Sequence, residues 1–150
     1  MNILMVCLGN ICRSPLAEGI LRSKLNSQEH FVDSAGTSSF HEGERPDPRT
    51  LRTAKKKGID MSAIVARPFK KEDFQKFDRI YAMDKSNLDH ILSLTQSEQE
   101  KEKVSLLLSL NHPGEQPEVP DPYFGGDEGF EIVFKLLDEA CETIAQGLKS

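Results

Sequence analysis

The chain has 150 residues, of which 37% are hydrophobic and 29% charged, as is typical of one soluble globular domain with a single core. The formal net charge of −5 gives a field that repels nucleic acid and anionic membrane surfaces. We therefore expect one domain over residues 1–150, with no nucleic-acid partner and no membrane partner. Any anionic ligand needs a local binding site.

The N-terminal residues MNILMVCLGN contain only a short apolar run without a basic flank, and no later stretch has the apolar length of a bilayer span. We therefore expect a cytoplasmic protein. Three cysteines, Cys7, Cys12 and Cys141, are an odd number in such a chain, which argues against a disulfide framework. The spacing of Cys7 and Cys12 fits no zinc motif, so we expect no bound metal.

Buried strands and helices alternate along the predicted fold. Apolar runs predict strands at NILMV (2–6), FVDSAG (31–36), DRIYAM (78–83) and KVSLLLSL (103–110). Helical periodicity falls at 14–25, 47–58, 70–77, 86–95 and 127–150. We expect the last of these to be the longest helix and to pack on the sheet. The alternation predicts a small doubly wound α/β fold with a parallel sheet.

Ligands of such sheets bind outside the carboxyl ends of the strands. Two irregular stretches, residues 34–48 and 111–127, follow the second and fourth predicted strands. Both are therefore placed to form walls of a site at the end of the first strand.

The first strand ends in VCLGNICRSPLAEG, residues 6–19. Ser14 and Pro15 predict a helix start, with Ser14 as the N-cap and Pro15 at the first helical position. The preceding turn would then present backbone N–H groups that can curl around an anion. Gly9 permits a positive φ and Asn10 tolerates one. Arg13 adds a planar fork suited to two oxygens of a phosphate.

Cys7 stands at the root of this turn, where amides, a helix dipole and a guanidinium together favour a thiolate. A thiolate that faces a bound phosphate is a nucleophile for a phosphoester. The alternative is that Cys7 is a small buried hydrophobe. A nucleotide-binding loop of the Walker type is excluded because the turn lacks a lysine and has one glycine. Cysteine, five residues, then arginine and serine at a strand-to-helix junction favours the nucleophile.

These residues resemble the signature of the low-molecular-weight protein tyrosine phosphatases. DSAGT, DPR, FDRIYAMDKSNL and PDPYFGG resemble further segments of that family in the expected order, so the resemblance covers nearly the whole chain. It implies a four-stranded parallel sheet flanked by helices, hydrolysis of phosphotyrosine through a cysteinyl-phosphate intermediate, and no cofactor. The expected partners are phosphotyrosine-containing proteins, with phosphate or vanadate as competitive ligands.

The resemblance also implies roles by matching position. Cys7 would be the nucleophile, Arg13 the clamp on the equatorial oxygens, and Ser14 the hydrogen-bond partner of the Cys7 sulfur. Asn10 and Ser34 resemble the pair that braces the loop from behind. The other members of the phosphate-binding loop would be Leu8, Gly9, Ile11 and Cys12.

In the PDPY motif, Asp121 would be the general acid that protonates the leaving phenolate and later takes a proton from water. Asp84 also follows a predicted strand, but it precedes a helical segment and is better placed as an N-cap. Asp121 lies between two prolines, which stiffen a loop that can cover the pocket.

Aromatic side chains should form the slot that admits a phosphotyrosine ring. Phe40, Tyr123 and Phe124 lie in the two site-facing stretches. The alternative role, anchoring a loop on the core, is strongest for Phe124, where many family members have a second tyrosine. His41 also lies in a site-facing stretch, although a substrate contact is not its expected role.

Two other reactions occur on similar chains. Phosphoarginine phosphatases commonly have a small polar residue where this loop has Ile11, whose apolar side chain suits an aromatic ring. Arsenate reductases relay electrons through further cysteines, whereas here only Cys141 remains. The family resemblance favours a protective disulfide of Cys12 with oxidised Cys7, which would make the protein redox-sensitive. The alternative is that Cys12 only fills space.

Overall fold

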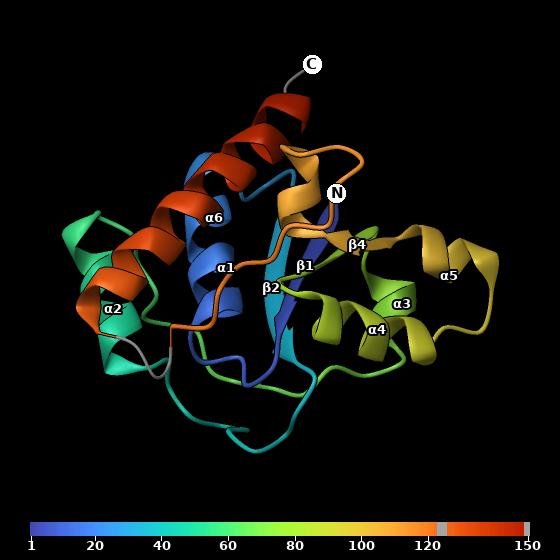
Figure 1. Cartoon of the computed structure of the whole chain (residues 1–150), viewed down its shortest axis with the longest axis horizontal. Coiled ribbons are helices and arrows are strands. Elements are labelled where there is room, and N and C mark those ends of the chain that lie inside the picture. Colours follow the sequence, from blue (N-terminus) through green and yellow to red (C-terminus); the bar gives the residue numbers. More distant parts are fainter. Residues whose placement is uncertain (123–125, 149–150) are drawn as a thin grey trace.

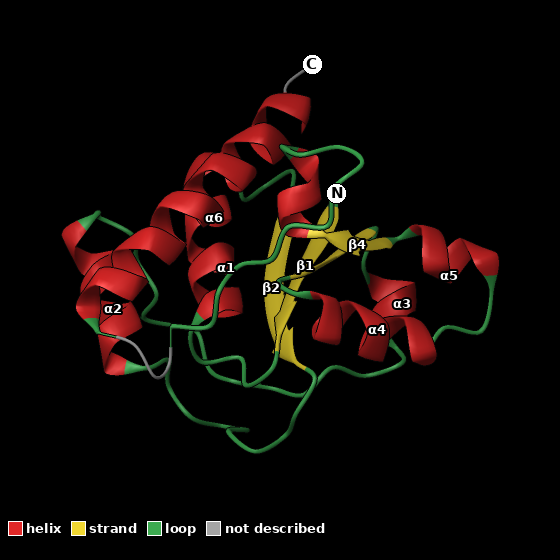
Figure 2. Ribbon diagram, viewed as in Figure 1, coloured by secondary structure: helices red, strands yellow, loops and turns green. Residues whose placement is uncertain are grey.

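The computed structural model describes residues 1–122 and 126–148 and contains one parallel sheet with helices on both faces (Figure 2). The order of its strands is β2-β1-β3-β4, so β1 is central and has a parallel neighbour on each side. The predicted four-stranded doubly wound architecture is therefore confirmed. The strands are β1 (Asn2–Cys7), β2 (Phe31–Gly36), β3 (Arg79–Ala82) and β4 (Val104–Leu106).

The helices of the described chain form two groups, one on each face of the sheet (Figure 1). The first group is α1 (Arg13–Lys24), α2 (Pro48–Lys56) and α6 (Asp127–Leu148). The second group is α3 (Asp73–Lys76), α4 (Lys85–Ser93) and α5 (Glu98–Glu102). The long helix α6 packs chiefly along α1 on the same face of the sheet. Among the residues described, no helix combines the length and the apolar character needed to cross a bilayer.

The central strand is buried on both faces, which explains its nearly continuous apolar sequence. Ile3, Met5 and Cys7 belong to the core shared with α1 and α6. Leu4 and Val6 belong to the second core, which is shared with α3 and α4. Because side chains alternate along a strand, Cys7 ends β1 on the face covered by α1.

The prediction of a fourth strand over residues 103–110 is only partly correct. It pairs with β3 over Val104–Leu106, and the chain then turns into a 3₁₀ helix, η1, over Leu107–Leu110. The register joins Ala82, the last residue of β3, to Leu106, so β4 has no partner beyond that point. Leu107 and Leu108 of η1 are buried without being part of the sheet, which the apolar pattern of the sequence could not reveal.

Helix α5 is absent from the sequence prediction because it has no buried residue and hence no apolar stripe. Its start is specified locally instead. The Ser97 side chain accepts a hydrogen bond from the N–H of Glu100 at 3.1 Å.

Gly36 ends β2 directly opposite Cys7 in the parallel register. A Cβ at this position would lie 2.8 Å from the carbonyl oxygen of Leu8 and 3.1 Å from that of Ser38. These neighbours are backbone atoms, so they cannot swing aside as a flexible side chain would. Gly36 therefore allows the loops after β1 and β2 to approach closely at one end of the sheet.

We predict that Gly36→Ala lowers the melting temperature by about 4–8 °C, since displacing packed backbone costs about 2 kcal/mol. Thermal unfolding followed by circular dichroism measures the change. The control is Gly147→Ala in α6, where an added Cβ meets nothing within 4 Å. Equal melting temperatures for the two variants would contradict the close approach at Gly36.

Candidate active site

Carbonyl groups of the turn between β1 and α1 accept hydrogen bonds from the backbone that surrounds the turn. The donors are the N–H of Thr37 to Cys7 O (2.9 Å), of Ser38 to Leu8 O (3.0 Å) and of Asp47 to Ile11 O (2.8 Å). In a planar trans peptide the N–H points away from its C=O. The N–H groups of Leu8, Gly9 and Cys12 therefore point to the inside of the turn, where the unpaired amides of the α1 N-terminus also lie. This arrangement can bind an anion.

A pocket of about 260 Å³ opens over the turn. It brings the carboxylate of Asp121, which is distant in the sequence, together with the sulfur-bearing Cys7 and the guanidinium of Arg13. Asn10, Ser14 and Ser34 are buried behind the pocket. Tyr123 and Phe124 fall outside the described residues. The lining residues are Cys7, Leu8, Gly9, Ile11, Cys12, Arg13, Phe40, His41 and Asp121.

Ser14 contacts the predicted nucleophile directly. Its Oγ lies 3.0 Å from the sulfur of Cys7, and the residue is fully buried. The prediction that Ser14 caps the helix is wrong, because α1 begins at Arg13 and its N-cap position is Cys12, without a side-chain cap. Pro15 is accordingly the third helical residue. The hydroxyl of Ser14 is engaged inside the loop and so cannot also serve the first amides of the helix.

The left-handed residue of the turn is Asn10, with φ of 58°. Of the two residues that could adopt a positive φ, Asn10 does so and Gly9 does not. Gly9 is needed for another reason. A Cβ there would lie 3.0 Å from Cδ2 of His41, so the imidazole packs directly on the loop backbone.

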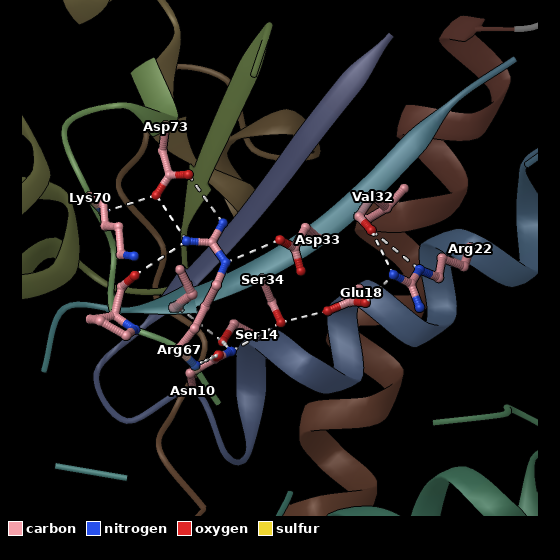
Figure 3. A network of polar contacts seen from close by, with 12 residues as sticks. Asn10, Ser14, Glu18, Arg22, Val32, Asp33, Ser34, Arg67, Lys70 and Asp73 are labelled. Carbon is pink, nitrogen blue, oxygen red and sulfur yellow. Dashed lines mark hydrogen bonds and ion pairs between the residues drawn. The ribbon is translucent and has the colours of Figure 1, made fainter. Parts of the chain in front are cut away.

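Asn10 connects the loop to the strand behind it (Figure 3). Its Nδ2 donates to Ser14 Oγ at 2.8 Å and to Ser34 Oγ at 3.0 Å. Its Oδ1 accepts from the backbone N–H of Arg67 at 3.0 Å. The Ser34 hydroxyl in turn donates to Glu18 Oε1 at 2.6 Å. Asn10 thus uses both of its amide hydrogens and its oxygen to fix the turn.

Arg13 is only 3% exposed and is held by residues from two other parts of the chain. Its Nη1 donates to Asp84 Oδ2 at 2.7 Å and to the carbonyl of Val119 at 3.0 Å. Its Nη2 lies 3.7 Å from Asp121 Oδ2. Burial opposes the positive charge, yet Cys7 and the two carboxylates raise the pKa of the guanidinium above its ordinary value. Arg13 is therefore a permanent cation in the pocket.

Asp84 has two partners. Its Oδ1 accepts from the N–H of Asn87 at 2.8 Å, which confirms the predicted N-cap of α4. The ion pair of Asp84 with Arg13 was not predicted. One feature of the sequence could have indicated this ion pair: Asp84 follows a predicted strand, and in the structure that strand, β3, pairs with β1.

The segment that carries Asp121 is tied to the same end of the sheet. The N–H of Val119 donates to Met83 O at 2.8 Å, and its carbonyl accepts from Arg13. Asp121 follows after Pro120, and its side chain is 43% exposed at the pocket. Its carboxyl is thus within reach of both the pocket and water.

The surroundings of Cys12 keep its thiol protonated. Burial raises the pKa of the Cys12 thiol to about 12, with Asp47 acting in the same direction and a contact with Thr50 opposing it. Cys12 is therefore a neutral thiol at pH 7, although it lines the same pocket as Cys7.

His41 is the pocket residue to which the sequence assigned no expected contact. Its Nδ1 lies 2.9 Å from Glu44 Oε2, and its ring meets the Phe40 ring edge to face with centroids 4.8 Å apart.

Within residues 1–122 and 126–148, no three His, Cys, Asp or Glu side chains cluster closely enough to hold a metal ion.

Comparison with known proteins gives consistent matches over the whole chain. A sequence model of the family described as low molecular weight phosphotyrosine protein phosphatase matches residues 2–150. The low molecular weight phosphotyrosine protein phosphatase of Schizosaccharomyces pombe is 44% identical over 143 residues, covering 91% of this chain and 90% of that protein.

Solved structures show the same similarity. A protein tyrosine phosphatase from Entamoeba histolytica, crystallised with Hepes in the active site, superimposes with a TM-score of 0.90 at 38% identity, covering 99% and 97% of the two chains. A Drosophila arginine phosphatase also superimposes with a TM-score of 0.90, at 35% identity and with 100% and 99% coverage.

We predict that Asp84→Asn lowers kcat/KM for an aryl phosphate by at least about 10-fold, or about 1.4 kcal/mol. Asparagine caps a helix as well as aspartate does, so the variant removes the charge beside Arg13 and keeps the start of α4. Steady-state kinetics measure the loss. The matched control is Asp60→Asn, whose exposed side chain accepts a local hydrogen bond from Ser62. A variant as active as this control would show that Arg13 does not depend on Asp84.

Proposed function

The chain belongs to the low molecular weight phosphotyrosine protein phosphatase family, and we propose that it hydrolyses phosphotyrosine monoesters of proteins through a phosphorylated cysteine, Cys7. The observation that carries the proposal is the convergence of Cys7, Arg13 and Asp121 on one pocket. A nucleophile, a cation and an acid are the three groups that a phosphoryl transfer of this kind requires. The reaction needs no cofactor.

The dianionic phosphate binds inside the turn, against the inward N–H groups and Arg13. Both Nη1 hydrogens of Arg13 are used by Asp84 and Val119. The edge formed by Nε–H and Nη2, which lies 3.7 Å from Asp121 Oδ2, faces two phosphate oxygens in the planar fork that suits bidentate binding. The groups that hold Arg13 thus also select the edge that it presents to substrate.

In the first step the Cys7 thiolate attacks phosphorus, the S–P bond forms, and the bond from phosphorus to the phenolic oxygen breaks. Asp121 protonates the departing phenolate, whose conjugate acid has a pKa near 10. In the second step Asp121 takes a proton from water, which attacks the same phosphorus. Inorganic phosphate and the Cys7 thiolate are released, and the hydroxyl of Ser14, 3.0 Å away, stabilises the departing sulfur.

The mouth of the pocket suits a flat apolar ring. Leu8 is 52% exposed and Phe40 82% exposed, and both line the pocket together with the buried Ile11. Exposed apolar side chains at the rim of a polar site indicate a surface that a ligand covers. Tyr123 and Phe124 would complete this slot according to the family resemblance.

Phosphoarginine is the alternative substrate, and the similarity to an arginine phosphatase supports it. Ile11 favours phosphotyrosine, because its apolar side chain lines the pocket and offers no partner to a guanidinium. Arsenate reduction has less support. It needs further reactive thiols, and Cys141 is fully buried in α6, where burial raises the pKa of its thiol.

Phosphate and vanadate should act as competitive ligands, which fits the Hepes molecule in the active site of the Entamoeba structure. We also place the protein in the cytoplasm, because the sequence features described above favour that compartment. Its net charge of −5 disfavours anionic surfaces as binding partners.

We predict turnover of phosphotyrosine peptides, with kcat/KM at least about 100-fold above that for phosphoserine or phosphoarginine peptides, equivalent to about 2.7 kcal/mol. Phosphate release from a panel of the three peptides, with arsenate reduction assayed beside them, measures this. Cys7→Ser is the control and should lose turnover while still binding vanadate. Preference for phosphoarginine, or activity in Cys7→Ser, would overturn the proposal.

Asp121→Ala should slow aryl phosphates with poor leaving groups much more than those with good ones, because only a poor leaving group needs the proton. A series of aryl phosphates of different phenol pKa gives the slope of log kcat/KM. We expect a steeper slope in Asp121→Ala than in the wild type. If Asp84→Ala alone steepens the slope, the acid is Asp84.

Oxidation should test the role of Cys12. Peroxide converts the Cys7 thiolate to a sulfenic acid, and the Cys12 thiol can displace water from it to form a disulfide. We predict that dithiothreitol restores the oxidised wild type, that bound phosphate slows the loss, and that Cys12→Ser recovers poorly. Cys141→Ser is the matched control and should recover like the wild type. If peptide mass spectrometry finds no Cys7–Cys12 link, Cys12 only fills space.

A further inference from the structure

A buried carboxylate, Glu18, lies behind the phosphate-binding turn and has no part in the chemistry above. It is 2% exposed and stands one helical turn after Ser14 on α1. Its Oε1 accepts from Ser34 at 2.6 Å, and its Oε2 lies 2.7 Å from Nη2 of Arg22 (Figure 3). Burying a carboxylate is unfavourable unless it is paired, so a group of this kind points to a function.

The ionised carboxylate fixes the hydroxyl of Ser34. A carboxylate only accepts hydrogen bonds, so the single hydroxyl hydrogen of Ser34 must point to Glu18. The oxygen of Ser34 is then left as an acceptor for the Asn10 amide, 3.0 Å away. Glu18 thereby decides how Ser34 faces the loop.

The same reasoning continues through Asn10 to Ser14. The backbone N–H of Arg67 can only donate, so it fixes the Asn10 amide with its oxygen toward Arg67 and its two hydrogens toward the serines. The oxygen of Ser14 therefore accepts from Asn10 at 2.8 Å and keeps its own hydrogen. Two acceptors are near that hydrogen, the Cys7 sulfur at 3.0 Å and the carbonyl of Ala35 at 3.4 Å. The sulfur is the closer one.

We propose that Glu18 is a positioning residue of the reaction: its carboxylate keeps Ser34 an acceptor, which together with the Arg67 N–H holds the Asn10 amide in a four-bond relay that ends with Ser14 donating to the Cys7 sulfur. The inference rests on the proposed function, because that hydrogen bond matters only if Cys7 becomes phosphorylated and must leave. A protonated Glu18 can itself donate to Ser34, whose own hydrogen is then released and can turn toward the Asn10 amide, so that the Arg67 N–H alone holds that amide.

The state of Glu18 changes in a relevant pH range. Burial raises its pKa to about 7, while the Ser34 hydrogen bond and Arg22 act in the opposite direction. Asp33 of β2 and Arg67, from the segment before α3, are the other charged groups that face it. Above this pH the carboxylate is ionised and Ser34 supports the Asn10 amide. Below it that support is lost and only the Arg67 N–H holds the amide.

Glu18→Gln tests the proposal, because glutamine has nearly the same shape and is neutral at every pH. We expect kcat about 3–10-fold below that of the wild type at pH 8, as for the loss of one hydrogen bond, with KM unchanged. The ratio of the two kcat values should approach one at pH 5.5, where Glu18 of the wild type is protonated too. Rapid-quench kinetics should place the loss in hydrolysis of the phosphorylated cysteine.

Arg22→Gln provides a second variant, should Glu18→Gln fold poorly. It keeps the carboxylate but removes its counter-ion, so the pH at which kcat changes should move upward. Glu98→Gln is the matched control, since Glu98 forms an exposed pair with Lys101. A kcat ratio for Glu18→Gln that is the same at all pH values, or an effect on KM alone, would overturn the proposal.

A readout without turnover separates this proposal from the function itself. In ¹H–¹⁵N spectra the side-chain amide of Asn10 should titrate with a midpoint near pH 7 in the wild type and not in Glu18→Gln. If this titration is seen in a protein inactive on phosphotyrosine, the relay stands and the proposed function fails. If it is missing from an active enzyme, the relay fails and the function stands.

Discussion

The buried guanidinium of Arg13 is the constraint around which this end of the molecule is built. A cation that is 3% exposed must be paired, and its partners are Asp84, two residues after β3, and the carbonyl of Val119, in the loop before Asp121. Pairing it therefore brings these two distant segments to the mouth of the first turn. The same contacts leave one edge of Arg13 for a ligand, so the group that organises the fold locally also prepares the site.

Asn10 plays the corresponding role inside the turn. Its left-handed backbone lets the loop close, and its side chain joins Ser14, Ser34 and the backbone of Arg67. The side chain of Arg67 is itself held by carboxylates of β2 and α3. The geometry of the loop is thus carried by hydrogen bonds to residues that never reach the pocket. Such support preorganises the turn, so that its geometry does not depend on a bound ligand.

Much of the fold follows from local pattern. The continuous apolar run of β1 identified a strand buried on both faces, and the junction from Cys7 to Ser14 indicated an anion-binding turn. Local rules failed where tertiary contacts override them. Ser14 has the residue type of a helix cap, but its hydroxyl is recruited by Cys7 and Asn10. The fourth apolar run has the composition of a long strand, but its neighbour β3 ends too soon.

The sequence by itself determined the strand-and-helix alternation and the residue types in the turn, because periodicity and short motifs depend on neighbours in the chain. Only the tertiary structure decided that Asp84 pairs with Arg13, 71 positions away, and that Arg67 fixes Asn10, 57 positions away. The carboxylate of Glu18 is the clearest case. In the sequence it is one charged residue of a helix, and only the tertiary structure buries it against Ser34 of β2, behind the turn.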